Sequence, residues 1–437
     1  MNWKFLLVRR CNFLCMRLWA GMILVLLRNR DFRSFLIANA LERFAASAMT
    51  VLLGLHVYEL THDLLDLGWL GFAEALPSLT LALYGGHVAD RHSRRRIVMI
   101  TSILLAILAA CLAVITGAGA VGLKTILLVA FLSGVIRAFE SPAASGMEAQ
   151  VVPVGHLMRG VSALVTSGRL ADMVGPAIGG LAWGLMGRED TYAAIATLFA
   201  LAGVALLVDG REQPVALPVG AHEEDIWTRI ARGLRFVFRS QVLAGSMALD
   251  LFAVFFGGAT ALLPAIATDV LHAGPTGLGL LRSSVSAGSL IAALGAARFI
   301  STRRAGWVFY GVVAGFGVSM VVFGFSRSLP LSLAALFLSG LCDGVGMIIR
   351  RAIIRLATPD ALRGRVSAVR MIFVGSSNEL GALESGIAAS LLGAAPAIWG
   401  GGLVTLGIVG VTILIAPKLR GLDIDALAQS QVVIPEG

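Results

Sequence analysis

Charged residues are scarce in this sequence. They occupy 14% of 437 positions, whereas a soluble globular protein has about 25%. Hydrophobic residues reach 57%, which is more apolar surface than a soluble core can enclose, so lipid must solvate much of the chain. Cysteine is also rare, and Cys11, Cys15, Cys111 and Cys342 show neither disulfide nor metal-ligand spacing. The composition therefore excludes a soluble globular domain and a disulfide scaffold.

Motifs for catalysis and cofactor binding are absent as well. The seven histidines do not combine with further ligands at zinc-binding spacing, and no G-x-S-x-G nucleophile motif occurs. Gly117–Thr125 is close to a phosphate-binding loop, but Leu123 interrupts it and no strand is expected before it. We therefore expect no metal site, no cofactor, no enzymatic activity and no ATP hydrolysis, which leaves a proton gradient as the energy source.

The chain contains instead a series of apolar segments, each long enough to cross a bilayer. We predict twelve transmembrane helices, at 34–58, 66–89, 97–117, 123–144, 161–186, 191–208, 241–268, 276–299, 306–326, 329–349, 366–392 and 394–416. Many are rich in Gly and Ala, which suits close helix packing in lipid. The predicted fold class is an all-α polytopic membrane protein.

Lysine and arginine are distributed very unevenly among the predicted connections. Nearly all lie on one side of the membrane, and the other side has only Lys124, Arg188 and Arg327. Since basic loops stay in the cytoplasm, we predict that both termini are cytoplasmic. The net charge of +9 is then a membrane-surface feature and not evidence for nucleic-acid binding.

A long polar stretch divides the chain into two sets of six spans. It ends in an amphipathic segment that fits a helix lying on the inner leaflet. The predicted regions are an N-terminal cytoplasmic or interfacial segment (1–33), a six-helix bundle (34–208), a cytoplasmic linker with the amphipathic helix (209–240), a second six-helix bundle (241–416) and a cytoplasmic tail (417–437).

The N-terminal segment allows more than one interpretation. Its apolar stretch, Leu18–Leu27, is too short to span a bilayer. The basic residues before it are typical of a signal peptide, but no small-residue cleavage site follows. An interfacial segment, or a start codon placed upstream of the true one, is favoured over a cleaved signal.

The two sets of spans repeat each other at an offset of 206 residues. Phe131–Gly134 recurs as Phe337–Gly340, and several further matches at this offset indicate duplication. Parallel six-helix repeats around a midplane site are a transporter architecture. The offset also places Arg137 opposite Asp343, and we predict a proton-sensitive ion pair between the halves there.

The segment from Gly86 to Arg96 resembles the signature loop of the major facilitator superfamily, with Ser93 in place of a usual glycine. The glycine that begins it would let another helix approach closely, and Asp90 could meet a helix N-terminus. The resemblance implies that this loop latches the two halves together in one conformational state. The alternative is a basic cytoplasmic loop with no switching role. The candidate switch residues are Gly86, Asp90, Arg91, Arg94 and Arg95.

Two further spans carry family-like motifs. Arg137 lies in a segment that resembles the family's membrane-embedded arginine motif, which implies proton coupling. A structural ion pair with Glu140, one turn away, is the alternative. Ala171–Gly180 resembles the antiporter motif of exporters, in which a proline kinks the helix beside packing glycines, and a generic packing kink is the alternative. The candidate residues of this motif are Gly175, Pro176, Gly179 and Gly180.

Charged residues inside predicted spans are functional candidates by default. Burial disfavours the ionised form of a carboxylate, so such a group can exchange protons near neutral pH, although any single one could be purely structural. Arg169 and Asp172 are three residues apart and are predicted to pair on one helix face. The candidates for proton coupling or for lining a cavity are Glu42, Arg137, Glu140, Asp172, Asp250, Asp343, Glu379 and Glu384.

Segments such as Leu362–Ala368, Ser376–Gly381 and Gly257–Pro264 are similar to the bacterial branch that includes enterobactin and multidrug exporters. The resemblance implies a monomeric, proton-coupled exporter that moves a small amphiphilic molecule by alternating access. An importer or uniporter, and a transporter-like ligand-sensing receptor, are the alternatives. The residues do not identify the cargo.

Overall fold

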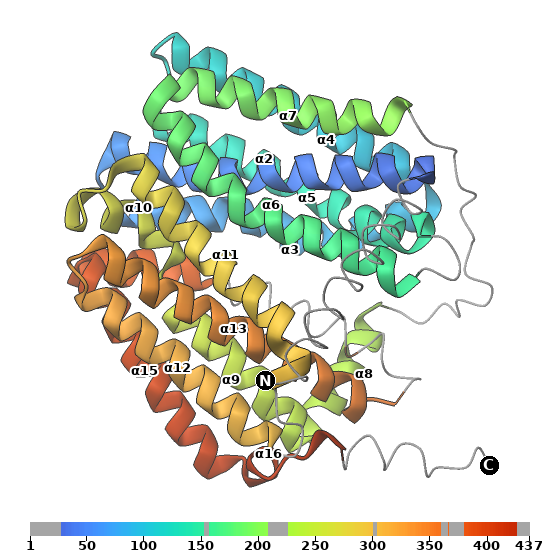
Figure 1. Ribbon diagram of the computed structural model, residues 1–437, viewed down its shortest axis with the longest axis vertical. Coiled ribbons are helices and arrows are strands. Elements are labelled where there is room, and N and C mark those ends of the chain that lie inside the picture. Colours follow the sequence, from blue (N-terminus) through green and yellow to red (C-terminus); the bar gives the residue numbers. More distant parts are fainter. Residues whose placement is uncertain are drawn as a thin grey trace, which may run out of the picture.

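The computed structural model describes residues 28–152, 157–208, 226–299, 304–359, 366 and 380–425. Every regular element in these ranges is a helix (Figure 1). The first bundle, which we name the N-terminal half, consists of α2 (Arg30–Thr61), α3 (Leu64–Arg91), α4 (Arg94–Gly117), α5 (Leu123–Val151), α6 (Leu157–Met186) and α7 (Arg188–Val208).

The second bundle, the C-terminal half, follows α8 (Ile226–Arg239). It consists of α9 (Gln241–Gly257), η1 (Ala259–Leu262), α10 (Leu263–Ala265), η2 (Ile266–Val270), α11 (Gly274–Phe299), α12 (Ala305–Phe325), α13 (Leu329–Ala357), the helix Leu380–Leu392, α15 (Ala394–Ile415) and α16 (Pro417–Arg420).

Nine helices within the described ranges are long and apolar enough to cross a membrane. The predicted spans at 66–89 and 161–186 coincide with α3 and α6, which are not among the nine because charged residues such as Glu74 and Asp172 interrupt their apolar character. The span predicted at 366–392 is described mainly as the short apolar helix Leu380–Leu392. The count of twelve spans therefore stays a prediction.

Polar caps explain where several of these helices begin. The Asn29 side chain accepts hydrogen bonds from the backbone N–H groups of Asp31 and Phe32 at the start of α2 (3.0 and 3.3 Å). Asp63 accepts one from Leu65 N–H at the start of α3 (2.8 Å). These side chains satisfy backbone donors that have no partner inside the helix. The first span thus begins at Arg30, a few residues before the predicted boundary at residue 34.

The span predicted at 241–268 is not one continuous helix. α9 ends at Gly257, a 3₁₀ turn and a short α-helical piece follow, and the span closes with a π-helical turn at Ile266–Val270. Pro264 lies at the start of α10, where its missing N–H costs little. Each change of helix type rotates the residues that follow it, which regular periodicity cannot predict.

The two halves meet along small residues. A Cβ on Gly180 of α6 would collide with the carbonyl of Pro275, and a Cβ on Gly279 of α11 with the carbonyl of Pro176. Gly68 of α3 lies similarly against Gly386. These contacts lie toward the end of the molecule with the short connections near residues 62, 187, 272 and 393, which we name the arginine-poor end (left in Figure 1).

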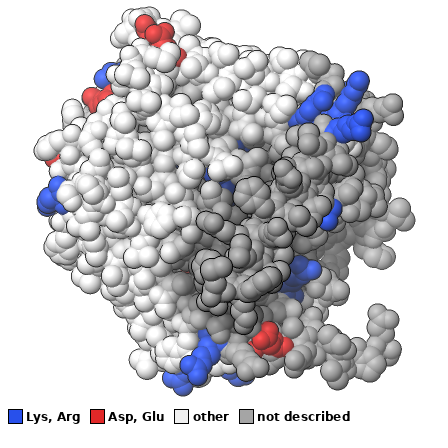
Figure 2. Space-filling view, in the orientation of Figure 1, with Lys and Arg blue, Asp and Glu red and all other residues white. Residues whose placement is uncertain are grey.

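Charge is concentrated at the opposite end, which we name the arginine-rich end. Figure 2 shows Lys and Arg side chains gathered there, with a broad surface almost free of charge beside them. An uncharged belt between polar ends is the surface expected of a protein that crosses a bilayer.

Candidate functional site

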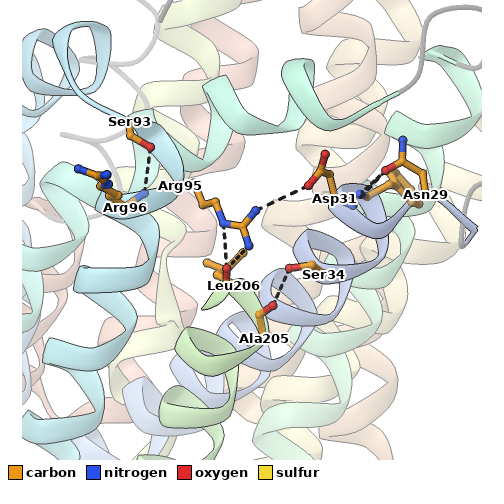
Figure 3. A network of polar contacts seen from close by, with 9 residues as sticks. Asn29, Asp31, Ser34, Ser93, Arg95, Arg96, Ala205 and Leu206 are labelled. Carbon is orange, nitrogen blue, oxygen red and sulfur yellow. Dashed lines mark hydrogen bonds and ion pairs between the residues drawn. The ribbon is translucent and has the colours of Figure 1, made fainter. Parts of the chain in front are cut away.

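Arg95, in the predicted switch loop, joins three helices of the N-terminal half (Figure 3). Its Nε donates to the carbonyl of Leu206 (2.8 Å), and its Nη1 pairs with Asp31 (3.7 Å). The nearby Ser34 hydroxyl donates to the carbonyl of Ala205 (2.6 Å). Both carbonyls belong to the last turn of α7, where no backbone N–H group of the helix is available to donate to them. Arg95 therefore holds the ends of α2, α4 and α7 together.

Arg94 acts in a similar way on α3 and α5. Its guanidinium donates to the carbonyl of Gly146 in α5 (3.1 Å) and pairs with Asp90 at the end of α3 (3.4 Å). Asp90 remains 62% exposed, and among the described residues its partner is Arg94. The contact with a helix N-terminus that we predicted is not seen among those residues. Arg91 is exposed to solvent. In this conformation the loop thus organises one half, and its role as a latch stays a prediction.

The close helix approach that we predicted at Gly86 is not seen among the described residues. A Cβ built on Gly86 would meet none of their atoms within 4 Å. The close approach occurs at the neighbouring Gly85, where a Cβ would collide with the carbonyl of Ala138, and at Gly134, where it would collide with the carbonyl of Glu74. α3 and α5 therefore touch along Gly85 and Gly134. Adjacent glycines face different sides of a helix, and the sequence does not say which one faces the neighbour.

Arg137 of α5 pairs within its own half. Its Nη1 lies 2.8 Å from the Glu74 carboxylate of α3, and its Nη2 lies 3.4 Å from the Thr50 hydroxyl of α2. The ion pair that we predicted with Asp343 is absent from the described structure. Glu140 interacts electrostatically with Arg137 and Arg43, but Glu74 is the carboxylate that forms the ion pair. Our candidate set omitted Glu74, although its place inside a predicted span was the available signal.

Glu42 lies within the same group of charges. It is 8% exposed, and the Ser102 hydroxyl lies 3.4 Å from its carboxylate. Glu140, Arg137 and Arg43 interact with it electrostatically. Three helices, α2, α3 and α5, thus bring carboxylates and guanidinium groups together inside one bundle. We name Glu42, Arg43, Glu74, Arg137 and Glu140 the bundle charge group. Glu42 is buried, whereas the Arg137 and Arg43 side chains are 35% and 49% exposed.

The predicted pair of Arg169 with Asp172 is also wrong. Asp172 pairs with Arg43 of α2 (3.2 Å), because that helix packs closely along α6. Arg169 points toward the other half, where its Nη2 lies 3.8 Å from the Met347 sulfur of α13. Asp343 of the same helix interacts electrostatically with Arg169. The contact of Arg169 with the other half is therefore at Met347, one turn from Asp343, and Arg169 is the cation that acts on Asp343 where we had expected Arg137.

Asp250 of α9 forms an ion pair with Arg350 of α13, and the two side chains are only 13% and 5% exposed. We predicted that the span at 329–349 ends one residue before Arg350, which would place Arg350 in a loop. α13 continues to Ala357 and buries Ile349, Ile353 and Ile354. The spacing of these isoleucines was the signal for a longer helix.

The antiporter-like motif packs on two neighbours. Cβ atoms on Gly175 and Gly179 would press on α2 at Phe44 and Ala48, whereas one on Gly180 would press on α11. The predicted close packing beside Pro176 is therefore present, and its link to export stays a prediction. Glu384 is half-buried on the helix Leu380–Leu392, and Glu379 lies outside the described residues.

At the arginine-poor end, one hydrogen bond joins the two halves. The Tyr58 hydroxyl of α2 donates to the Asp269 carboxylate in the π-helical turn η2. Closer to the middle, the Ser283 hydroxyl of α11 donates to the carbonyl of Met173 of α6 (2.5 Å). The polar contacts between halves in the described structure therefore lie at the arginine-poor end and in the centre. Within the described residues no group of acidic, His and Cys side chains could hold a metal ion.

The chain is similar in sequence to a known family and to several known proteins. The family model described as Major Facilitator Superfamily matches residues 35–382. The chain is 29% identical over 371 residues to the multidrug efflux pump Tap of Mycolicibacterium fortuitum, covering 82% of this chain and 89% of that protein. It is 21% identical over 408 residues to the enterobactin exporter EntS of Citrobacter koseri, covering 91% and 94%.

Two solved structures show a similar fold. The nucleoside transporter NupG matches with a TM-score of 0.68 at 15% identity, covering 89% of this chain and 98% of that one. A POT family transporter in complex with 5-aminolevulinic acid matches with a TM-score of 0.71 at 13% identity, covering 90% and 97%. At these identities the likeness concerns the fold alone.

Proposed function

Because the chain belongs to the Major Facilitator Superfamily, a family of membrane transporters and not of enzymes, we propose that it exports a small amphiphilic molecule in exchange for protons. The observation that carries this proposal is the bundle charge group, with Glu42 buried at its centre, since ionisable side chains inside a membrane bundle are costly and are kept for function. The names of the multidrug pump and the enterobactin exporter support export and an amphiphilic cargo. The proton gradient supplies the energy, and no cofactor takes part.

The proposed architecture is two six-helix bundles with the predicted domain boundaries, acting as a monomer in the bacterial inner membrane with both termini in the cytoplasm. The basic connections at the arginine-rich end support this orientation. The close contacts at Gly68, Gly180 and Tyr58 then close the molecule on its outer side. The described conformation is accordingly the one that opens toward the cytoplasm, and Gly86 and Asp90 engage the C-terminal half in the opposite conformation.

Protons bind at Glu42 in this mechanism. Its burial disfavours a negative charge, whereas Arg137 and Arg43 favour one, so a small movement of either arginine decides whether the carboxyl holds a proton. Arg137 already divides its contacts between α2 and α3. Movement of Arg137 during the transport cycle therefore couples release of the proton to the change of access.

The test uses inverted membrane vesicles that contain the protein and an imposed proton gradient, with a panel of amphiphilic fluorescent dyes as probes. We expect gradient-dependent dye uptake by the wild type. In Glu42→Gln this dependence is lost while dye binding is retained. The matched control is Glu189→Gln, an exposed carboxylate in the first turn of α7 at the arginine-poor end, and it should behave as the wild type.

The outcomes separate the alternatives. Dye flux that ignores the gradient in the wild type would indicate a uniporter, and movement in the opposite direction an importer. Binding without any flux would indicate a ligand-sensing receptor. Glu42→Gln with full gradient dependence would contradict the role given to Glu42 but leave export standing.

A further inference from the structure

The amphipathic helix α8, at the arginine-rich end of the C-terminal half, has a buried side and an exposed side. Val237 is 1% exposed and belongs to the same apolar cluster as Leu243 and Leu419, so α8 is anchored to the bundle. Phe238 is 63% exposed and Leu234 36% exposed. These two are one helical turn apart and form a single apolar ridge.

A basic ridge runs beside this apolar one. Arg235 and Arg239 are both exposed and are also one turn apart. Each follows directly in the chain after an exposed apolar residue, so the two ridges are neighbours on the surface of α8. A helix with this pattern suits the boundary between lipid headgroups and acyl chains, where both ridges find partners.

The start of α9 ties this helix to α16. The Gln241 side-chain amide donates to the carbonyl of Ile415 (2.8 Å), and its oxygen accepts from the backbone N–H of Lys418 (3.3 Å). Gln241 is two residues after Arg239, so α8 ends where α16 begins. Leu419 is fully buried, which fixes the short helix α16 against the bundle.

Two more cations, on α16, and the end of α15 lie next to the contacts of Gln241. Lys418 and Arg420 are exposed. Leu414 and Ile415, in the last turn of α15, are 80% and 68% exposed. Lysine and arginine thus follow directly after an apolar helix end that faces lipid, which is where a phospholipid places its phosphate.

Among the described residues at this position, cations outnumber acidic residues. Asp423 and Asp425 follow α16, and Glu223–Asp225, which precede α8 in the chain, lie outside the described residues. Against Asp423 and Asp425 stand four cations, Arg235, Arg239, Lys418 and Arg420, and in the described structure none of these four side chains forms an ion pair. An anionic headgroup would neutralise them without displacing an existing partner.

We propose that Arg235, Arg239, Lys418 and Arg420 bind the phosphate of an anionic phospholipid. The acyl chains of this lipid contact Phe238 of α8 and the exposed end of α15. The site holds α8 on the membrane surface. Because α8 directly precedes α9, the position of the start of α9 then depends on the lipid composition of the surrounding leaflet. This proposal depends on the membrane location of the protein and not on the identity of its cargo.

The test is direct binding of phosphatidylglycerol to the purified full-length protein in a neutral detergent, followed by native mass spectrometry. We expect phosphatidylglycerol to bind more tightly than phosphatidylcholine. The double variant Arg235→Gln/Arg239→Gln should bind it about 25-fold more weakly, at roughly fivefold for each lost cation. Arg235→Lys/Arg239→Lys keeps the charge and should retain most of the binding.

The matched control removes two exposed cations from the arginine-poor end, in Lys124→Gln/Arg327→Gln, and it should bind as the wild type. All variants are compared only as monodisperse protein. Equal affinity for the two lipids, or unchanged binding by the glutamine variant of α8, would overturn the proposal. Displacement of the lipid by millimolar inorganic phosphate would overturn the lipid assignment in favour of a free-phosphate site.

Discussion

At the scale of single residues, the ion pair between Asp250 and Arg350 presents the sharpest energetic conflict. Both side chains are almost fully enclosed between α9 and α13. Desolvation of two ions costs several kcal/mol each, and their attraction repays this only while both partners are present. Such a pair is therefore tolerant of joint replacement and intolerant of the loss of one member.

This argument leads to a stability prediction. Arg350→Met should lower the free energy of unfolding by about 3–5 kcal/mol, because it leaves the Asp250 carboxylate buried without its cation. The double variant Arg350→Met/Asp250→Asn should recover much of this loss. The measurement is thermal unfolding of detergent-purified protein. A double variant as unstable as Arg350→Met alone would show that packing, and not charge, accounts for the effect.

At the scale of helices, much of the architecture follows from apolar runs and basic loops, and the partners of individual charges do not. The predicted spans coincide with α4, α12 and α15 within a few residues, because hydropathy depends only on local composition. The partner of Arg137 depends on how α3, α5 and α13 are rotated about their axes. That rotation is set by tertiary packing, so sequence separation alone suggested Asp343 where the structure has Glu74.

The packing of α3 on α5 gives a matched pair of substitutions at adjacent positions. Gly85→Ala should destabilise the protein by about 1–3 kcal/mol, because its new methyl group meets the carbonyl of Ala138. Gly86→Ala should leave thermal stability nearly unchanged, since its new methyl group meets no atom of the described residues within 4 Å. If Gly86 contacts the other half in the opposite conformation, Gly86→Ala should still reduce transport. Equal stability of the two variants would contradict the observed helix contact.

At the scale of the whole molecule, the described parts of the two halves are joined by backbone contacts at glycines and by few polar bonds. Gly180 and Gly279 let α6 and α11 touch without interlocking side chains, an interface that can open and close at little cost. The Tyr58–Asp269 hydrogen bond adds a polar contact at the arginine-poor end. Because an average hydrogen bond contributes about 0.5–1.5 kcal/mol, its removal should shift the balance between conformations without unfolding either half.

Cysteine cross-linking at the arginine-poor end can measure this shift. A Cβ on Gly184 would lie 3.6 Å from the Thr276 hydroxyl, so Gly184→Cys/Thr276→Cys, in a background without the native cysteines, should form a disulfide while this end is closed. Adding Tyr58→Phe should slow cross-linking by about two- to tenfold, as expected from the loss of one hydrogen bond. Tyr84→Phe, at an exposed tyrosine of α3, is the control. An unchanged rate in Tyr58→Phe would mean that the glycine contacts alone keep this end closed, whereas a faster rate would mean that the hydrogen bond favours the open form.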